Sequence, residues 1–307
     1  MEKLDSNLLR EIADMDTENT GGAVNIRKNG GLASRYSTPN IQILSKEDKP
    51  GIDVHIKPFT KGESVHIPVI ITESGFTDLV YNDFYIGEGA DVVIVAGCGI
   101  HNSGHAKTQH DGIHTFHLGK GARVHYSEKH YGEGGGTGEK VLNPETLVYL
   151  EEDASITLDM VQIRGVDSTK RYTKVIAEGA NAECIVNEKL LTDGKQFAES
   201  RMDVILNGSD SKTQVVSRSV AQDESVQVFY PQVEGNAACF GHVQCDSIIM
   251  DKARVSSIPA IVANDMDAQL VHEAAIGRIA GDQILKLMTL GLTEEEAEAK
   301  ILDGFLQ

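Results

Sequence analysis

The sequence predicts a mainly β protein whose core is a parallel β-helix, a solenoid of stacked turns, and two observations support that prediction. The first is a repeated phrase, in which apolar residues precede a short turn rich in Gly, Asp or Asn, then a small residue and an alternating strand. The second is the period, because Ala90, Ala122 and Ala154 lie 32 residues apart. Stacked turns bury their apolar faces only against their neighbours, which suits such repeats. A β-sandwich also has short strands, but it has no reason to repeat one phrase.

Residues 1–40 are predicted to precede the solenoid as a helix and a loop arm. Apolar residues recur at helical spacing between charged ones, at Leu4, Leu8, Ile12 and Met15. This spacing predicts an amphipathic helix over residues 3–15. Residues 19–37 contain Gly-Gly twice and show little periodicity, which indicates a loop or a mobile arm.

Residues 41–278 are assigned to the solenoid core. The alternation of apolar and polar residues begins with Ile41, Ile43, Ile52, Val54 and Ile56. The clearest repeats cover residues 85–93, 117–124 and 149–156, and weaker copies follow at residues 175–180, 205–210, 248–253 and 261–268. Because no helical periodicity interrupts these repeats, we expect one strand after another to the end of the region.

Residues 279–307 change to a helical pattern that predicts two short helices. Asp282 is placed to cap the first helix and Gly291 to end it, and Thr293 with Glu296 forms a capping box for the second. The apolar positions that we expect to bind a partner are Ile284, Leu287, Met288, Ile301 and Phe305. Two short helices cannot bury all their apolar faces alone, so they either cover the end of the solenoid or dock a second protein.

Composition excludes several classes of function. The net charge of -18 repels the phosphates of nucleic acid, and no apolar run approaches the roughly 18 residues of a membrane span. The N-terminus lacks the cationic start and apolar core of a secretory signal, so we expect a cytoplasmic protein. Four cysteines are too few for a disulfide scaffold, and a reducing compartment would keep them as thiols.

A candidate metal site is formed by Cys245, His272 and Glu273, with His242 as a further candidate ligand. The thiolate, imidazole and carboxylate offer soft, borderline and hard ligand atoms, a mixture that suits iron or zinc. If Cys245 and His272 lie in successive turns, their spacing brings them side by side. Adjacent residues of a strand face opposite ways, so His272 and Glu273 serve together only at a strand end, a bulge or a subunit interface.

A second candidate is the segment from Cys98 to His130, which is rich in histidine. Its histidines are His101, His105, His110, His114, His117, His125 and His130. Such a cluster either binds a transition metal, with Cys98 and His101 as possible ligands, or consists of solvated and hydrogen-bonded loop histidines. Several glycines indicate a loop-rich stretch, and no tetrahedral ligand set can be named from it.

The usual signatures of nucleotide and hydrolase sites are missing. The glycine-rich residues 132–140 lack the Gly-Lys-Ser/Thr ending of a phosphate loop, and neither Gly-x-Ser-x-Gly nor His-Glu-x-x-His occurs. A solenoid enzyme acting on carbohydrate would need clustered carboxylates on one face, which the strands do not show. That enzyme, and a structural interaction module that binds zinc, are the alternatives considered.

Residues 241–305 resemble the SufB/SufD scaffolds of iron-sulfur cluster assembly. The matching phrases are Gln-Cys-Asp-Ser-Ile-Ile at 244–249, Asp-Ala-Gln-Leu-Val-His-Glu-Ala at 267–274, Gly-Asp-Gln-Ile-Leu at 281–285, Gly-Leu-Thr-Glu-Glu-Glu-Ala at 291–297 and Gly-Phe at 304–305, with Pro259 between the first two. The resemblance implies a right-handed parallel β-helix and a non-enzymatic scaffold that holds a transient iron-sulfur cluster. By position, Cys245 resembles the cluster thiolate, and His272 and Glu273 the nitrogen and oxygen ligands.

The resemblance also implies partners. Members of this family bind an ABC-type ATPase, SufC, through their C-terminal helices, and they pair with one another through strands near the cluster. A sulfur donor and apoprotein acceptors complete the set. The motifs are closer to SufB than to SufD, so a homodimer would supply both halves without a separate homologue. No position clearly matches the family's sulfur-entry cysteine, and Cys184 is the candidate for that role.

Overall fold

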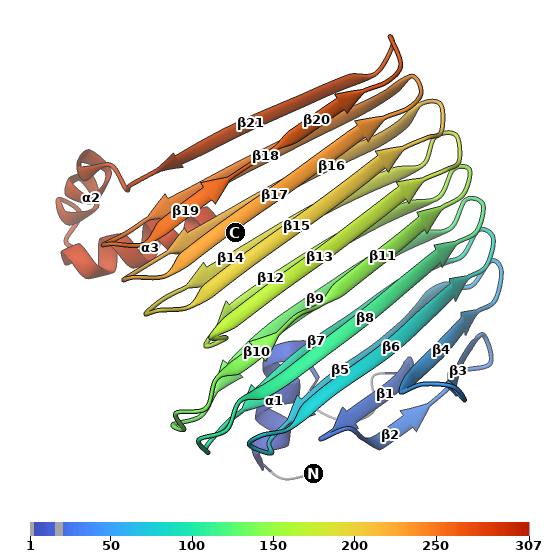
Figure 1. Ribbon diagram of the computed structural model, residues 1–307, viewed down its shortest axis with the longest axis horizontal. Coiled ribbons are helices and arrows are strands. Elements are labelled where there is room, and N and C mark those ends of the chain that lie inside the picture. Colours follow the sequence, from blue (N-terminus) through green and yellow to red (C-terminus); the bar gives the residue numbers. More distant parts are fainter. Residues whose placement is uncertain (1–2, 16–20, 307) are drawn as a thin grey trace.

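The computed structural model describes residues 3–15 and 21–306, in which a β-solenoid of about eight turns dominates (Figure 1). Strands make up 59% of the protein and helices 10%, in agreement with a mainly β chain. Successive strands of the solenoid alternate between two long sheets, so a strand pairs with the strands one turn before and one turn after it. The predicted parallel solenoid is confirmed.

Two sheets form the walls of the solenoid. Sheet A contains, in spatial order, β2 (Gly31–Tyr36), β1 (Ala23–Lys28), β5 (Lys61–Ile71), β7 (Asp91–His101), β9 (Arg123–Glu133), β12 (Ser155–Arg164), β14 (Glu183–Thr192), β16 (Ser211–Ala221), β18 (Cys239–Ile249) and β21 (Gln269–Gly277). Sheet B contains β19 (Arg254–Ser257), β17 (Val226–Gly235), β15 (Phe197–Leu206), β13 (Ser168–Ala177), β10 (Lys140–Leu142), β8 (Thr108–Leu118), β6 (Thr77–Ile86), β4 (Gly51–Ile56) and β3 (Ile41–Ser45). In addition, β11 (Glu145–Leu150) joins β8 and β13, and β20 (Ala260–Ala263) joins β17.

The core lies between the sheets because every second side chain of a strand points inward. Phe84 and Phe116, in register on β6 and β8, stack with their centroids 4.5 Å apart. Ala90, Ala122 and Ala154 are each 0% exposed at the turns, which explains the small residue in the repeated phrase. Asp153 and Asn181 occupy left-handed turn positions that Asp and Asn tolerate better than other side chains.

The N-terminal helix α1 (Lys3–Ala13) packs on the outer face of β5, β7 and β9. Leu8 and Ile12 are buried against the sheet, as the helical spacing predicts. Gly97 makes this close approach possible, because a Cβ atom there would lie 2.4 Å from the carbonyl oxygen of Ile12. The helix therefore covers one end of sheet A, and the predicted amphipathic helix is confirmed.

The loop predicted over residues 19–37 is wrong for its described part. Residues 23–36 form an antiparallel hairpin of β1 and β2, and β1 also pairs in parallel with β5. Asn29 and Gly30 form the turn with φ of 46° and 75°. Asn-Gly between strands is a strong hairpin signal, and the two Gly-Gly pairs obscured it. The parts of the predicted N-terminal region at residues 1–2 and 16–20, and residue 307 of the last segment, lie outside the described residues.

Two helices follow the last strand, as predicted. In α3 (Glu294–Leu306), the Thr293 backbone N–H donates to Glu296 at 2.8 Å and the Glu296 N–H donates to the Thr293 hydroxyl at 3.2 Å, which confirms the capping box. In α2 (Gly281–Met288), Ala280 occupies the cap position without a side-chain hydrogen bond, so Asp282 lies in the first turn and its prediction as the cap is wrong.

Within the described residues no helix is both long and apolar enough to cross a membrane.

Candidate functional site

Strands β18 and β21 bring Cys245 and His272 together at the last turn of the solenoid. Val243 pairs with His272 and Cys245 with Ala274, so both Cys245 and His272 point to the interior side of sheet A. The Cys245 Sγ atom lies 3.3 Å from His272 Nε2. The expectation that a spacing of 27 residues would place them side by side is therefore confirmed.

Glu273 lies on the opposite face of β21, as the alternation of a strand requires. Its Oε2 atom is 3.6 Å from His242 Nε2, and its side chain is 66% exposed. The four candidate ligands thus separate into an inner thiol and imidazole and an outer imidazole and carboxylate. Within one chain Glu273 does not join Cys245 and His272.

The surroundings of Cys245 and His272 favour the neutral form of both side chains. Burial raises the pKa of the Cys245 thiol to about 11, and the charges of Glu188 and Asp246 add to the rise, although the Ser257 hydroxyl opposes it. Burial and the nearby His242 lower the pKa of His272. At neutral pH the thiol therefore holds its proton and the imidazole has a free electron pair, so a metal ion would have to displace the thiol proton.

The ligand set of a metal is incomplete in one chain. Within residues 3–15 and 21–306, no three side chains of His, Cys, Asp or Glu are placed to hold a metal ion. Cys245 and His272 supply one sulfur and one nitrogen ligand, whereas a tetrahedral site needs four ligands. A metal ion held by this pair would therefore need further ligands from outside the described chain.

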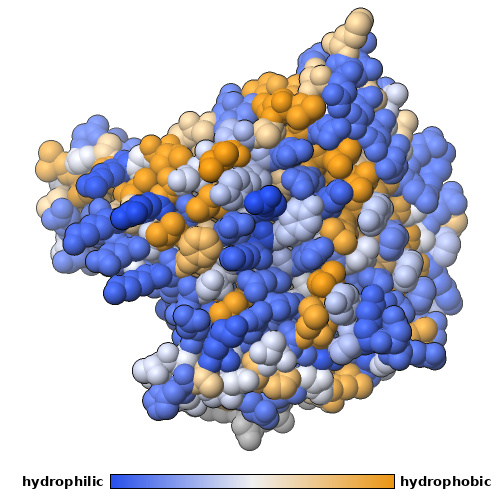
Figure 2. Space-filling view, in the orientation of Figure 1, coloured by the Kyte–Doolittle hydropathy of each residue, from blue (hydrophilic) through white to orange (hydrophobic). Residues whose placement is uncertain are grey.

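The end of the solenoid beside this pair is open. β21 is the last strand of sheet A, and its outer edge pairs with no strand of the described chain. Apolar side chains gather over β20 and β21 (Figure 2). The exposed large apolar residues of this end are Ile258, Ile261, Val262, Met266, Val271 and Ile276. An uncovered edge strand with exposed apolar side chains is a template for pairing with another chain.

The histidine-rich segment lies mostly in strands, so the prediction of a loop-rich stretch is wrong. Gly99 and Gly112 lie inside β7 and β8, where the parallel ladder overrides the glycine signal, whereas Gly104, Gly119 and Gly121 lie in the connections between strands. Cys98 faces the interior in register with His130, whereas His101 pairs with Glu133 at 3.2 Å. The other histidines divide between interior strand positions, the outer face and, for His105, an exposed turn. They form no common ligand set in the described residues.

The sequence analysis did not predict a network of charged side chains inside the solenoid. Arg171 Nη1 lies 2.7 Å from Glu128 Oε2, and Arg171 Nε lies 3.7 Å from Glu188 Oε1. The Tyr126 hydroxyl donates to Glu128 at 3.1 Å and contacts His114 Nδ1 at 2.7 Å. The available signal was that charged residues occupy inward positions in alternating strands, as Glu128 does between Tyr126 and His130.

Burial and charge shift the pKa values of this network. Burial lowers the pKa of His114 to about 4, against the opposing charge of Glu128. Burial alone would raise the pKa of Glu128, but the neighbouring His130 and Arg171 hold it well below its ordinary value. The folded protein therefore favours a neutral His114 beside an ionised Glu128.

We expect acid to destabilise the protein through His114. Unfolded, this residue binds a proton near pH 6.5, whereas folded it stays neutral down to about pH 4. Between these values the unfolded state holds more protons, so the free energy of unfolding falls as the pH falls, by about 2 kcal/mol between pH 7.5 and pH 5. Chemical unfolding at the two pH values measures the effect. His114→Gln should reduce it, whereas His105→Gln, in an exposed turn, should not; equal pH dependence in both variants would contradict this assignment.

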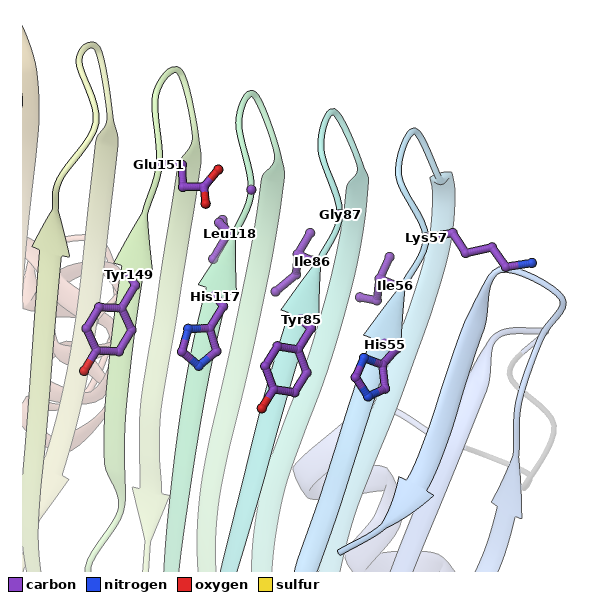
Figure 3. Close-up of a pocket in the computed structure, with 11 residues that line it drawn as sticks. His55, Ile56, Lys57, Tyr85, Ile86, Gly87, His117, Leu118, Tyr149 and Glu151 are labelled. Atoms are coloured by element: carbon purple, nitrogen blue, oxygen red, sulfur yellow. The ribbon is translucent and has the colours of Figure 1, made fainter.

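A row of four stacked rings lies on the outer face of sheet B (Figure 3). His55, Tyr85, His117 and Tyr149 follow one another with centroids 4.8 to 5.2 Å apart and nearly parallel planes. They border a groove of about 410 Å³. Because neighbours cover both faces of Tyr85 and His117, these two rings present only edges to a ligand. This arrangement does not suit stacking on sugar rings and weighs against the carbohydrate-active alternative.

Comparisons with known proteins cover most of the chain. A family model described as "SUF system FeS cluster assembly, SufBD core domain" matches residues 73–305. An iron-sulfur cluster assembly SufBD family protein of Methanothermobacter thermautotrophicus is 28% identical over 228 residues, which cover 71% of this chain and 53% of that protein. Similar proteins of Methanocaldococcus jannaschii and Archaeoglobus fulgidus are 28% and 26% identical, over 79% and 87% of this chain and 76% and 70% of their own. The chain thus spans about half the length of the first of these relatives.

Proposed function

The chain belongs to the SufBD core-domain family of iron-sulfur cluster assembly proteins, and from that premise we propose that it is a non-catalytic scaffold on which clusters are built and from which they are transferred. Membership of the family supports a role in cluster assembly. The finer proposal rests chiefly on one observation, the pairing of Cys245 Sγ with His272 Nε2 at 3.3 Å beside the open end of the solenoid.

In this proposal the cluster is cargo, held through Cys245 and His272. A thiolate and an imidazole are ligands that iron accepts, and iron binding would favour the deprotonated thiol. The edge of the last turn leaves one side of the pair open for further ligands. Cys245 is 3% exposed even though nothing in the described part of the single chain covers β21, so β21 itself would have to move before a cluster held there could be transferred.

We propose that a second copy of this chain, or a SufB/SufD homologue, covers the open edge. Two copies of β21 can extend sheet A across the interface and bury the exposed apolar residues of β20 and β21. Glu273, which points away from Cys245 in its own chain, then becomes available at the interface. His272 and Glu273 point to opposite faces of β21, and a cluster shared between two chains would use both faces.

The C-terminal helices are the proposed docking site for an ABC-type ATPase of the SufC kind. Leu285 and Met288 of α2 are exposed, and among the described residues of α2 and α3 only Ala297 is buried. Arg218 of β16 donates a hydrogen bond to the carbonyl oxygen of Phe305 at 3.5 Å. Because β16 lies two strands from the open edge, a movement of the helices can reach β21 through sheet A. ATP hydrolysis would then belong to the partner.

The zinc-binding module stays the principal alternative, because zinc accepts the same thiol and imidazole. Four free cysteines suit a reducing compartment such as the cytoplasm and leave the thiol available to either metal. The metal content of protein isolated without oxygen separates the two functions. Iron with acid-labile sulfide supports the scaffold, and zinc without sulfide supports the module.

We therefore expect anaerobic co-purification from the native host to yield the chain with an ABC-type ATPase, a sulfur donor, iron and sulfide. A chain that ends at residue 280 should lose the ATPase and keep its strand content, because the solenoid core does not include α2 and α3. Counting subunits, iron and sulfide in both samples measures the result. Equal recovery of the ATPase with the shortened chain would contradict the docking site, and absence of iron and sulfide from the complete chain would contradict the scaffold.

A further inference from the structure

The groove beside the four stacked rings of sheet B has features that stacking alone does not explain. His55 of β4, Tyr85 of β6, His117 of β8 and Tyr149 of β11 lie in one parallel register, so each turn of the solenoid adds one ring to the row. Stacking stabilises such a row. Even so, Tyr85 and Tyr149 remain 39% and 38% exposed beside a groove of about 410 Å³. Exposed aromatic side chains along a groove offer a surface that another molecule can cover.

The two tyrosines present hydrogen-bond donors at a regular spacing. Figure 3 shows the hydroxyls of Tyr85 and Tyr149 on the same side of the row, and no hydrogen bond among the described residues uses either of them. The His117 ring lies between the two tyrosine rings, with steps of 5.2 Å on each side, so the tyrosines repeat at about 10 Å. Gly87 and Gly119 also line the groove and add no side chain to it. The groove therefore suits an elongated molecule that accepts hydrogen bonds about 10 Å apart.

This spacing favours one conformation of a bound polypeptide. A polyproline II helix has three residues per turn and rises about 3.1 Å per residue, so equivalent carbonyl oxygens recur every ~9.3 Å. These carbonyls make no internal hydrogen bonds and are free to accept. A β-strand repeats after about 6.6 Å, which does not match. Seven residues of an α-helix span about 10.5 Å, but the helix uses its carbonyls internally.

Opposite charges lie at the two ends of the groove. Lys57 directly follows β4 and Glu151 directly follows β11, and both are exposed (Figure 3). A segment with an acidic residue near Lys57 and a basic residue near Glu151 complements these charges. The prolines between them are neutral, which avoids the repulsion that a net charge of -18 exerts on an acidic partner.

We propose that this groove binds a proline-rich segment of a second protein in the polyproline II conformation. The hydroxyls of Tyr85 and Tyr149 donate to backbone carbonyls three residues apart, and the prolines lie over Gly87 and Gly119. Such a segment is already extended before it binds and loses little conformational entropy, which is why aromatic-lined grooves recognise it. The inference does not rest on the proposed function, because the groove belongs to sheet B whereas Cys245 lies on β18 of sheet A.

Fluorescence polarization with labelled peptides tests the proposal on the complete purified chain. Each test peptide has six prolines, which span about 19 Å in the polyproline II conformation, between one aspartate and one arginine. Two such peptides carry the charges in opposite orders, and matched controls replace the prolines with Gly-Ser repeats. We expect saturable binding of one proline peptide, about tenfold tighter than its Gly-Ser control, because the preformed helix pays less entropy on binding.

Tyr85→Phe removes one donor and keeps the stacked ring, so this variant should fold like the wild type. The loss of one hydrogen bond should weaken binding of the proline peptide about fivefold, and the double change with Tyr149→Phe should weaken it about 25-fold. Tyr81→Phe is the matched control and should bind as the wild type does. Tyr81 lies on the same strand and the same face, but its ring contacts Lys49 and does not line the groove.

Four results would overturn the proposal. Absence of saturable binding shows that the groove does not dock such a segment, and equal affinity for the proline and Gly-Ser peptides shows that charge alone attracts the probe. Equal effects of Tyr81→Phe and Tyr85→Phe place the peptide elsewhere. Sedimentation of the wild type as a dimer that the Tyr85→Phe and Tyr149→Phe pair dissociates assigns the groove to a second copy of this chain. Iron and sulfide content are not measured in this test, so its failure leaves the proposed function standing.

Discussion

Cys245→Ser is expected to abolish retention of an iron-sulfur cluster after anaerobic reconstitution while the solenoid stays folded. The thiol supplies the one sulfur ligand that one chain offers at the open end, 3.3 Å from His272 Nε2. Removing even an outer partner of a metal ligand typically costs about 10–100-fold in affinity, so loss of the ligand itself should reduce bound iron and sulfide at least tenfold. Iron and sulfide analysis with visible absorbance measures this loss.

Cys239→Ser is the matched control for that experiment. Cys239 lies on the same strand, β18, and is 7% exposed, but it is six residues away from Cys245, the residue whose thiol contacts His272. Its substitution should leave cluster content near the wild-type level, and far-ultraviolet circular dichroism should show the same strand content in both variants. Equal cluster content in the two variants would contradict the assignment of Cys245 as a cluster ligand.

Arg171→Met should destabilise the fold more than any single surface change. Arg171 is 6% exposed and contacts Glu128 and Glu188, so the substitution leaves two carboxylates inside the solenoid without their cation. Removing one partner from a buried ion pair costs about 3–5 kcal/mol. Chemical unfolding of the purified variants should show a loss of that size in the free energy of unfolding.

Arg201→Met provides the comparison, because the Arg201 side chain is 54% exposed on the neighbouring strand β15. An exposed ion pair contributes about 0–1 kcal/mol, so this variant should unfold close to the wild type. If Arg171→Met also unfolds within 1 kcal/mol of the wild type, the interior charges are solvated or rearranged, and the network does not hold the sheets together.

The sequence repeats predicted the solenoid because each turn of this fold has the same pattern of residues and contacts mainly its neighbouring turns. Each small residue, such as Ala122, follows a turn and starts a strand, and every turn repeats that relation to its neighbours. The same periodicity placed Cys245 and His272 one turn apart and therefore in contact. Local signals also located the capping box of Thr293 and Glu296.

The interior network could not be predicted in the same way, because its partners lie at unrelated distances along the chain. Arg171 meets Glu128 across 43 residues, from one sheet to the other, and only the closed shape of the solenoid brings them together. The N-terminal hairpin was not predicted for a different reason. Its Asn29-Gly30 turn signal was present, but the two Gly-Gly pairs obscured it.

Pulsed electron paramagnetic resonance of the reduced, reconstituted cluster tests the central claim most directly. If His272 and Cys245 hold the cluster together, the spectrum should contain a hyperfine coupling from a histidine nitrogen, and His272→Ala should remove it. A reconstituted wild-type cluster without nitrogen coupling, or a coupling that persists unchanged in His272→Ala, would contradict the assignment of the thiol and imidazole pair as the site of assembly.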